Sequence, residues 1–138
     1  MGTSEKWLLV VEDNSDDELL ARRAFTAANR REKLHVARNG EEALEVLKSH
    51  GSPVLVLLDL KLPRLSGVEV LMAMKDDIRL RKIPVVILTS SDETSDICAC
   101  YELGCNAFVR KPVDYEPFMT TLSSTLNFWL TVNETYAD

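Results

Sequence analysis

The stretch Val54-Leu55-Val56-Leu57-Leu58-Asp59 is an uninterrupted apolar run that ends in a carboxylate. A second run of the same kind, Trp7-Leu8-Leu9-Val10-Val11, ends in Glu12-Asp13. Runs of this length that are rich in Val and Leu are typical of strands buried on both faces of a parallel sheet. Because ligands of open α/β sheets bind at the carboxyl ends of the strands, we expect these acids to share a ligand-binding edge.

Length and charge narrow the class of protein. The chain has 138 residues, so we expect one domain with a short C-terminal tail over about 131–138 and no output domain. The net charge of −6 and the scattered basic residues argue against nucleic-acid binding. The apolar runs are far shorter than the roughly 18 to 20 residues that span a membrane, and the N-terminus lacks a signal-peptide pattern. These features predict a cytoplasmic protein that binds neither nucleic acid nor membrane.

Apolar runs alternate with amphipathic segments along the whole chain. The predicted strands are 7–11, about 34–37, 54–58, 85–89 and 107–110. The predicted helices cover about 15–29, 41–48, 67–77, 93–103 and 115–130. This alternation predicts an α/β fold of the flavodoxin-like (βα)5 type, with a doubly wound five-stranded parallel sheet in the order 2-1-3-4-5. The switch point, between the first and third strands, then lies beside the acids that follow them.

Polar side chains follow the predicted strands at that edge. They are Glu12, Asp13, Asp59, Thr89 and Lys111. A single acid after a strand is more often a turn or cap residue, but here several strands direct polar groups to one place. Carboxylates that lie close together repel, and a divalent cation is the simplest compensation. Oxygen ligands that are open to water favour Mg²⁺.

The remaining polar groups suit a phosphoryl group. Lys111 supplies a cation, Thr89 a hydroxyl, and Ser90 is small enough to leave the pocket accessible. Metal, ammonium and hydroxyl together match the equatorial oxygens of a transferring phosphoryl group. Asp59 is then the candidate nucleophile, which would form an acyl phosphate.

The same residues resemble a known family. The matching segments are Val10-Val11-Glu12-Asp13-Asn14, Leu58-Asp59-Leu60-Lys61-Leu62-Pro63 with Gly67, Leu88-Thr89-Ser90 and Phe108-Val109-Arg110-Lys111-Pro112. In this order they resemble the receiver domain of two-component response regulators, and the resemblance covers nearly the entire chain. Thr89 and Lys111 lie 30 and 52 residues after Asp59, which fits receiver spacing.

The resemblance implies a phosphoacceptor rather than an enzyme that turns over an external substrate. Asp59 would take a phosphoryl group from a sensor histidine kinase in a Mg²⁺-dependent reaction. Asp13, Asp59 and the backbone carbonyl of Lys61 would hold the ion, and Glu12 would reach it through water.

The resemblance also assigns the switch. Thr89, Ser90 and Lys111 would surround the phosphoryl oxygens, and a cis bond before Pro112 would place the lysine. Phe108 occupies the position of the family's switch aromatic. The output would pass through the face formed by the fourth helix, fifth strand and fifth helix.

Two aromatic residues near the C-terminus indicate an interface. Phe128 and Trp129 are adjacent, so both cannot face inward on one helix, and one is a candidate anchor for a homodimer. The Phe-Trp-Leu ending is similar to that of stand-alone regulators that partner phytochrome-type histidine kinases and typically form homodimers. We therefore expect a role in phytochrome light signalling, with an unidentified downstream protein.

Two alternative functions of a receiver remain open. The receiver could be a phosphotransfer intermediate or a protein-binding module that works without phosphorylation. An aspartyl phosphatase would need a second acid where this chain has Lys61. A nucleotide- or flavin-binding module would need a glycine-rich loop where the chain has Asp13-Asn14-Ser15-Asp16-Asp17.

Overall fold

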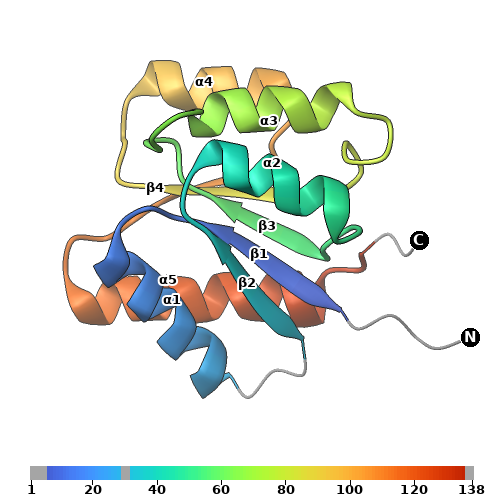
Figure 1. The fold of residues 1–138 in the computed structure, drawn as a ribbon. Coiled ribbons are helices and arrows are strands. Elements are labelled where there is room, and N and C mark those ends of the chain that lie inside the picture. Colours follow the sequence, from blue (N-terminus) through green and yellow to red (C-terminus); the bar gives the residue numbers. More distant parts are fainter. Residues whose placement is uncertain (1–5, 29–31, 136–138) are drawn as a thin grey trace, which may run out of the picture.

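The computed structural model describes residues 6–28 and 32–135. These residues form one parallel sheet of five strands in the order β2-β1-β3-β4-β5, as the sequence predicts (Figure 1). The strands are β1 Trp7–Val11, β2 Lys33–Ala37, β3 Leu55–Leu58, β4 Val85–Thr89 and β5 Ala107–Arg110. The helices are α1 Ser15–Ala27, α2 Gly40–Ser49, α3 Gly67–Asp76, α4 Thr94–Leu103 and α5 Tyr115–Asn127, followed by the π-helical turn η1 Phe128–Val132.

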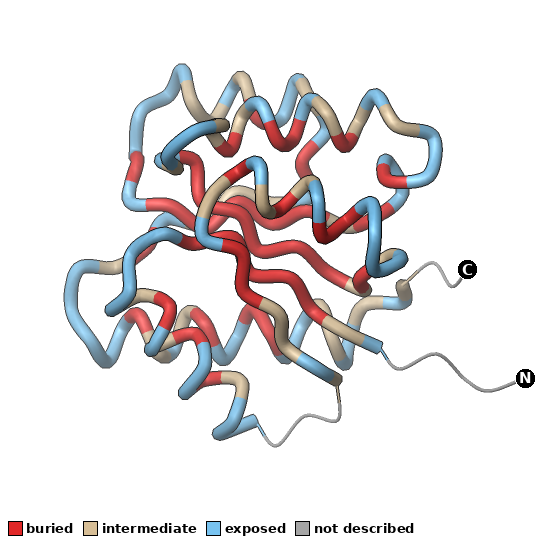
Figure 2. The backbone as a smooth tube through the Cα atoms, in the orientation of Figure 1, coloured by how far each residue is buried: buried red, intermediate tan, exposed pale blue. Residues whose placement is uncertain are grey.

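Helices cover both faces of the sheet (Figure 1). Helices α1 and α5 pack on one face, and α2, α3 and α4 pack on the other. Successive side chains of a strand point to opposite faces of the sheet. Leu8 and Val10 of β1 therefore lie in the core under α1 and α5, the α1–α5 core, and Leu9 and Val11 lie in the core under α2, α3 and α4, the α2–α4 core. The three central strands, β1, β3 and β4, are therefore buried along almost their whole length, whereas the edge strands β2 and β5 are only partly buried (Figure 2). Full burial contributes about 1.5–3 kcal/mol for each such aliphatic side chain.

Local capping fixes where several helices begin. The Asn14 side chain accepts from the backbone N–H groups of Asp16 and Asp17 at the start of α1. Ser66 and Glu69 form a reciprocal capping box at the start of α3. Because each cap lies in the loop that follows a strand, the first turns of these helices lie at the carboxyl edge of the sheet.

The ends of two helices differ from the prediction. Helix α1 ends at Ala27, and Asn29, where the prediction ended it, lies outside the described residues. Helix α5 ends at Asn127 and continues as η1, in which the Asn133 N–H donates to the Phe128 carbonyl at 2.7 Å. The wider turn changes the direction of the side chains that follow α5. Among the described residues, no helix is both long and apolar enough to cross a bilayer.

Candidate functional site

The predicted acids meet at the carboxyl edge of the sheet. Carboxylate oxygens of Glu12, Asp13 and Asp59 lie within 4.8 Å of one another. The backbone N–H of Asp59 donates to the Val11 carbonyl at 3.1 Å, so β3 ends beside β1 and the acids are held together by the register of the sheet. Glu12 and Asp59 are buried, with 5% and 7% of their surfaces exposed, whereas Asp13 is exposed.

Lys111 supplies the cation that these acids need. Its Nζ donates to Glu12 at 2.6 Å, to Asp59 at 2.8 Å and to Asp17 at 2.9 Å. The lysine is buried, so its ammonium group is stabilised by carboxylates in place of water. Asp17 was not predicted as a site residue. Its position in the first turn of α1, beside the carboxyl edge, is the signal that could have identified it.

Burial and ion pairing shift the ionisation of two of these groups. Burial, opposed by the Lys111 hydrogen bond, raises the pKa of Glu12 from 4.5 to about 7. Burial also lowers the pKa of Lys111, but its hydrogen bonds to Asp59, Glu12 and Asp17 outweigh this and raise the pKa above its usual value. The lysine therefore remains charged while Glu12 titrates near neutral pH.

The loop after β3 holds the other oxygen of Asp59. The backbone N–H of Leu60 donates to Asp59 Oδ1 at 2.7 Å, and that of Lys61 lies 3.4 Å from the same oxygen. Gly67 packs against this backbone so closely that a Cβ atom there would lie 2.1 Å from the Asp59 carbonyl oxygen. Any other residue at 67 would push the start of α3 away from the acidic site.

Thr89 ends β4 and is fully buried beside the site. Its Oγ1 accepts the Ser91 N–H at 3.4 Å, and the Ser91 hydroxyl donates to Asp96 of α4 at 2.6 Å. The Lys111 N–H donates to the Thr89 carbonyl at 2.7 Å. Ser90 is exposed and lines a small hollow of about 260 Å³ beside Lys111. Thr89 is thus connected to both Lys111 and α4.

The prediction of a cis bond before Pro112 is wrong. The Lys111–Pro112 peptide bond is trans, and cis bonds are absent from the described residues. Trans is the intrinsically preferred isomer even before proline, by about 0.5–1 kcal/mol. With this isomer Lys111 already reaches its carboxylate partners. Phe108 lies in β5 opposite Ile87 and is half-buried against the α2–α4 core.

The two C-terminal aromatic residues face different surroundings, as their adjacency predicts. Trp129 is half-buried against the α1–α5 core, whereas 46% of the Phe128 surface is exposed. Their rings meet edge to face with centroids 5.2 Å apart. Phe128 is therefore the residue of this pair that is available to a partner.

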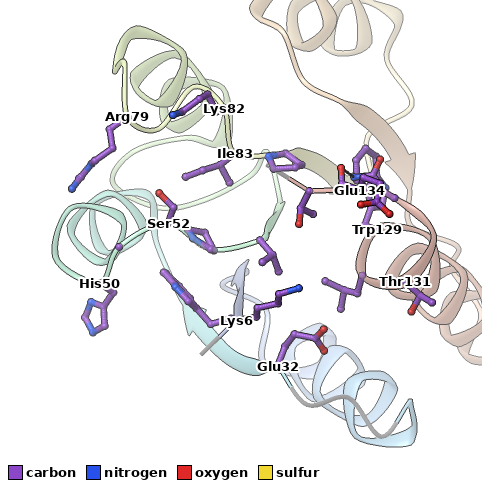
Figure 3. Close-up of a pocket in the computed structure, with 18 residues that line it drawn as sticks. Lys6, Glu32, His50, Ser52, Arg79, Lys82, Ile83, Trp129, Thr131 and Glu134 are labelled. Atoms are coloured by element: carbon purple, nitrogen blue, oxygen red, sulfur yellow. Dashed lines mark hydrogen bonds between the residues drawn. The ribbon is translucent and has the colours of Figure 1, made fainter. Parts of the chain in front are cut away.

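A larger hollow lies at the opposite, amino edge of the sheet (Figure 3). It measures about 910 Å³, and basic and aromatic side chains line much of it. They include Lys6, Trp7, His50, Arg79, Lys82 and Trp129. The sequence did not predict this hollow, because its walls come from the starts of strands and the ends of helices that are distant in the chain.

The residues at the carboxyl edge fit a hard cation. The donors are carboxylate oxygens, and the exposed Asp13 keeps the cluster open to water. Hard divalent cations such as Mg²⁺ prefer a few carboxylates with water completing the shell. The cluster provides this donor set.

Comparison with known proteins agrees with this arrangement. Residues 8–123 match the model of the response regulator receiver domain. The chain is 37% identical over 128 residues to the probable methanogenesis regulatory protein FilR2 of Methanothrix harundinacea, covering 89% of this chain and 83% of FilR2. It is 34% identical over 131 residues to the response regulator Rcp1 of Synechocystis, covering 91% and 89%.

Solved structures agree as well. The phosphorylated cyanobacterial phytochrome response regulator RcpA superposes with a TM-score of 0.93 at 31% identity, covering 97% of this chain and all of RcpA. The Mn²⁺-bound form of Rcp1 superposes with a TM-score of 0.91 at 33% identity, covering 96% and 99%. The chain therefore belongs to the response regulator receiver domain family of two-component signalling.

Proposed function

We propose that Asp59 accepts a phosphoryl group from the phosphohistidine of a sensor kinase. The observation that carries this proposal is the contact of Asp59 with the buried Lys111 ammonium at 2.8 Å, beside two further carboxylates. In the transfer, an Asp59 oxygen forms a bond to phosphorus, the phosphorus–nitrogen bond breaks, and the imidazole nitrogen keeps the electron pair. Lys111 stabilises the charge that the phosphoryl oxygens carry.

Glu12, Asp13 and Asp59, with the Lys61 backbone carbonyl, are the residues that would hold Mg²⁺. When bound there, the ion supplies positive charge to the phosphoryl oxygens. The proposal is supported by the all-oxygen donor set and by the exposure of Asp13, which leaves room for water ligands. The Mn²⁺-bound form of Rcp1 supports a divalent cation in a similar protein.

The switch would start from Thr89 and Lys111. Phosphorylation adds roughly two negative charges and three acceptor oxygens, so any conformation that brings these two donors closer is stabilised. Thr89 would donate its hydroxyl proton to the phosphoryl group, and its movement toward that group would stretch the 3.4 Å bond that its Oγ1 accepts from Ser91, whose hydroxyl donates to Asp96 of α4. The change would thereby reach the face formed by α4, β5 and α5, including Phe108.

We further propose that the protein serves phytochrome signalling in the cytoplasm as a homodimer. Its likeness to RcpA supports the phytochrome assignment. The exposed Phe128 ring, next to the half-buried Trp129, supports an interface at the end of α5. Light-scattering mass at micromolar concentration should show a dimer for the wild type and a monomer for Phe128→Ser. A wild-type monomer, with and without a phosphoryl mimic, would contradict the dimer.

Phosphorylation itself is tested by intact mass. After incubation with acetyl phosphate and Mg²⁺, the wild type should gain one phosphoryl group and Asp59→Asn should gain none. Asp92→Asn is a matched control, because Asp92 is exposed and pairs with Arg110 away from the cluster. If the wild type gained nothing under any condition, or Asp59→Asn gained as much, the assignment of Asp59 would be wrong.

A further inference from the structure

The chain has two histidines, and the fold brings them together far from the acidic site. His35 lies in β2, the edge strand, and His50 caps the end of α2. Their ring centroids are 5.4 Å apart, with the ring planes at 60°. Trp7 of β1 completes the group, with its ring 6.2 Å from His35 and 6.3 Å from His50.

The strand pattern explains the meeting. His35 alternates with Ala37 along β2, and Ala37 belongs to the core under α2, so His35 faces α2. Trp7 likewise packs against that core. Helix α2 ends over this part of the sheet and delivers His50, which is exposed while His35 is half-buried.

A short chain of polar contacts links the His50 ring to the last turn of α2. The Ser49 hydroxyl donates its single proton to the Glu45 carbonyl at 2.9 Å. When the Ser49 hydroxyl makes that bond, the imidazole N–H is the donor in the 2.9 Å contact between His50 Nδ1 and Ser49 Oγ. In this tautomer the lone pair of Nε2 is free to bind a metal ion. This is the arrangement in which metal-binding histidines are found, with the second nitrogen held by another group.

We propose that His35 and His50 form a second metal site, which takes a borderline transition cation such as Zn²⁺ or Ni²⁺. Imidazole nitrogens select such ions, whereas the carboxylates at the other edge select hard ones. With metal–nitrogen distances of about 2.0–2.1 Å and tetrahedral angles, two imidazole centres around one ion lie roughly 5 Å apart. The observed 5.4 Å between the ring centroids matches this spacing, and water would fill the remaining positions on the ion. The ion would link the edge strand β2 to the end of α2.

The site is tested with Ni²⁺ on tag-free protein in excess Mg²⁺, which occupies the carboxylates. Calorimetry should show one Ni²⁺ per wild-type chain, and Trp7 fluorescence should be quenched as it binds. Either His35→Gln or His50→Gln should weaken binding on the order of tenfold to a hundredfold, because one ligand of the chelate is lost. Asp59→Asn should bind Ni²⁺ as the wild type does, so this site and the phosphoacceptor are tested separately.

Two control variants assign the Ni²⁺ signals to the histidines. Cys98 is an exposed thiol, so Cys98→Ser must retain full Ni²⁺ binding. Trp7→Phe should lose the quenching but keep the calorimetric signal. In the wild type, substoichiometric Ni²⁺ should broaden the ring proton resonances of both histidines before other resonances. Wild-type affinity in both histidine variants, or no binding by the wild type, would overturn the proposal.

Discussion

The two edges of the sheet are built from the same strands but have opposite chemistry. At the carboxyl edge, buried Glu12 and Asp59 share the Lys111 ammonium. At the amino edge, a hollow of about 910 Å³ is lined by three cations, Lys6, Arg79 and Lys82, and by the acids Glu32 and Glu134. The carboxyl edge is dense with ion pairs, whereas the amino edge is open around its hollow (Figure 3).

Helix direction accounts for part of this difference. Helices of a doubly wound sheet begin at the carboxyl edge, where their positive dipole ends favour anions, and end at the amino edge, where the negative ends favour cations. The Arg79 guanidinium illustrates the second case, because it donates to the Leu47 carbonyl in the last turn of α2 at 3.4 Å. The fold itself therefore biases the charge that each edge of the sheet favours, before any particular side chain is considered.

The largest loss of stability is expected from removing Lys111, the cation at the carboxyl edge. Lys111→Met would leave Glu12 and Asp59 buried without their partner, which should cost about 3–5 kcal/mol of unfolding free energy. The matched control at the open edge, Lys6→Met, should change stability by less than about 0.5 kcal/mol because Lys6 is exposed. Urea unfolding in EDTA measures both. Equal losses of stability in the two variants would show that Lys111 does not stabilise the carboxyl edge.

A smaller loss of stability is expected when the pH is raised. Burial raises the pKa of Glu12 to about 7, so the folded protein binds this proton more tightly than the unfolded chain, whose pKa is near 4.5. The contribution of the Glu12 proton to the free energy of unfolding is fully present below pH 4.5 and is lost as the pH rises through 7.

Relative to Glu12→Gln, the wild type in EDTA should therefore lose stability, by about 3 kcal/mol, between about pH 4.5 and pH 8. Urea unfolding of both proteins across this range measures the difference. Parallel pH profiles for the wild type and the variant would show that Glu12 is not the titrating group.

Binding of Mg²⁺ should raise the free energy of unfolding by about 1.4 kcal/mol when the ion is present at ten times its Kd. Thermal unfolding should show this stabilisation in the wild type and not in Asp13→Asn, which removes one of the clustered carboxylates. Asp16→Asn is the matched control, since Asp16 is an exposed acid of α1 outside the cluster. Retention of the Mg²⁺ effect in Asp13→Asn would place the ion elsewhere.

The smallest effect is expected at the open edge. Arg79→Met removes the donor to the Leu47 carbonyl, which should cost about 0.5–1 kcal/mol. Phosphoryl gain at Asp59 should be unchanged, since the two groups lie at opposite edges. A loss of phosphorylation in this variant would show that the edges are coupled.

Much of the carboxyl edge could be predicted because strand ends are encoded locally. The apolar runs before Glu12, Asp59 and Thr89 each specify a buried strand, and parallel pairing then requires their ends to meet. The alternation of strands and helices likewise determined the layers and the strand order. The binding of Mg²⁺ and the transfer to Asp59 remain predictions.

Only the tertiary structure decided which side chains meet across elements. Asp17 reaches Lys111 because α1 packs against α5, the helix that follows Lys111 in the chain, and no local pattern encodes this contact. The trans bond before Pro112, for which the sequence predicted cis, and the π-helical turn after α5 are likewise seen only in the structure. The same is true of His35 and His50, since their spacing depends on how α2 lies on the edge strand. The sequence by itself determined the strands and the acidic edge, because burial patterns are local, whereas contacts between distant elements depend on the packed geometry of the whole domain.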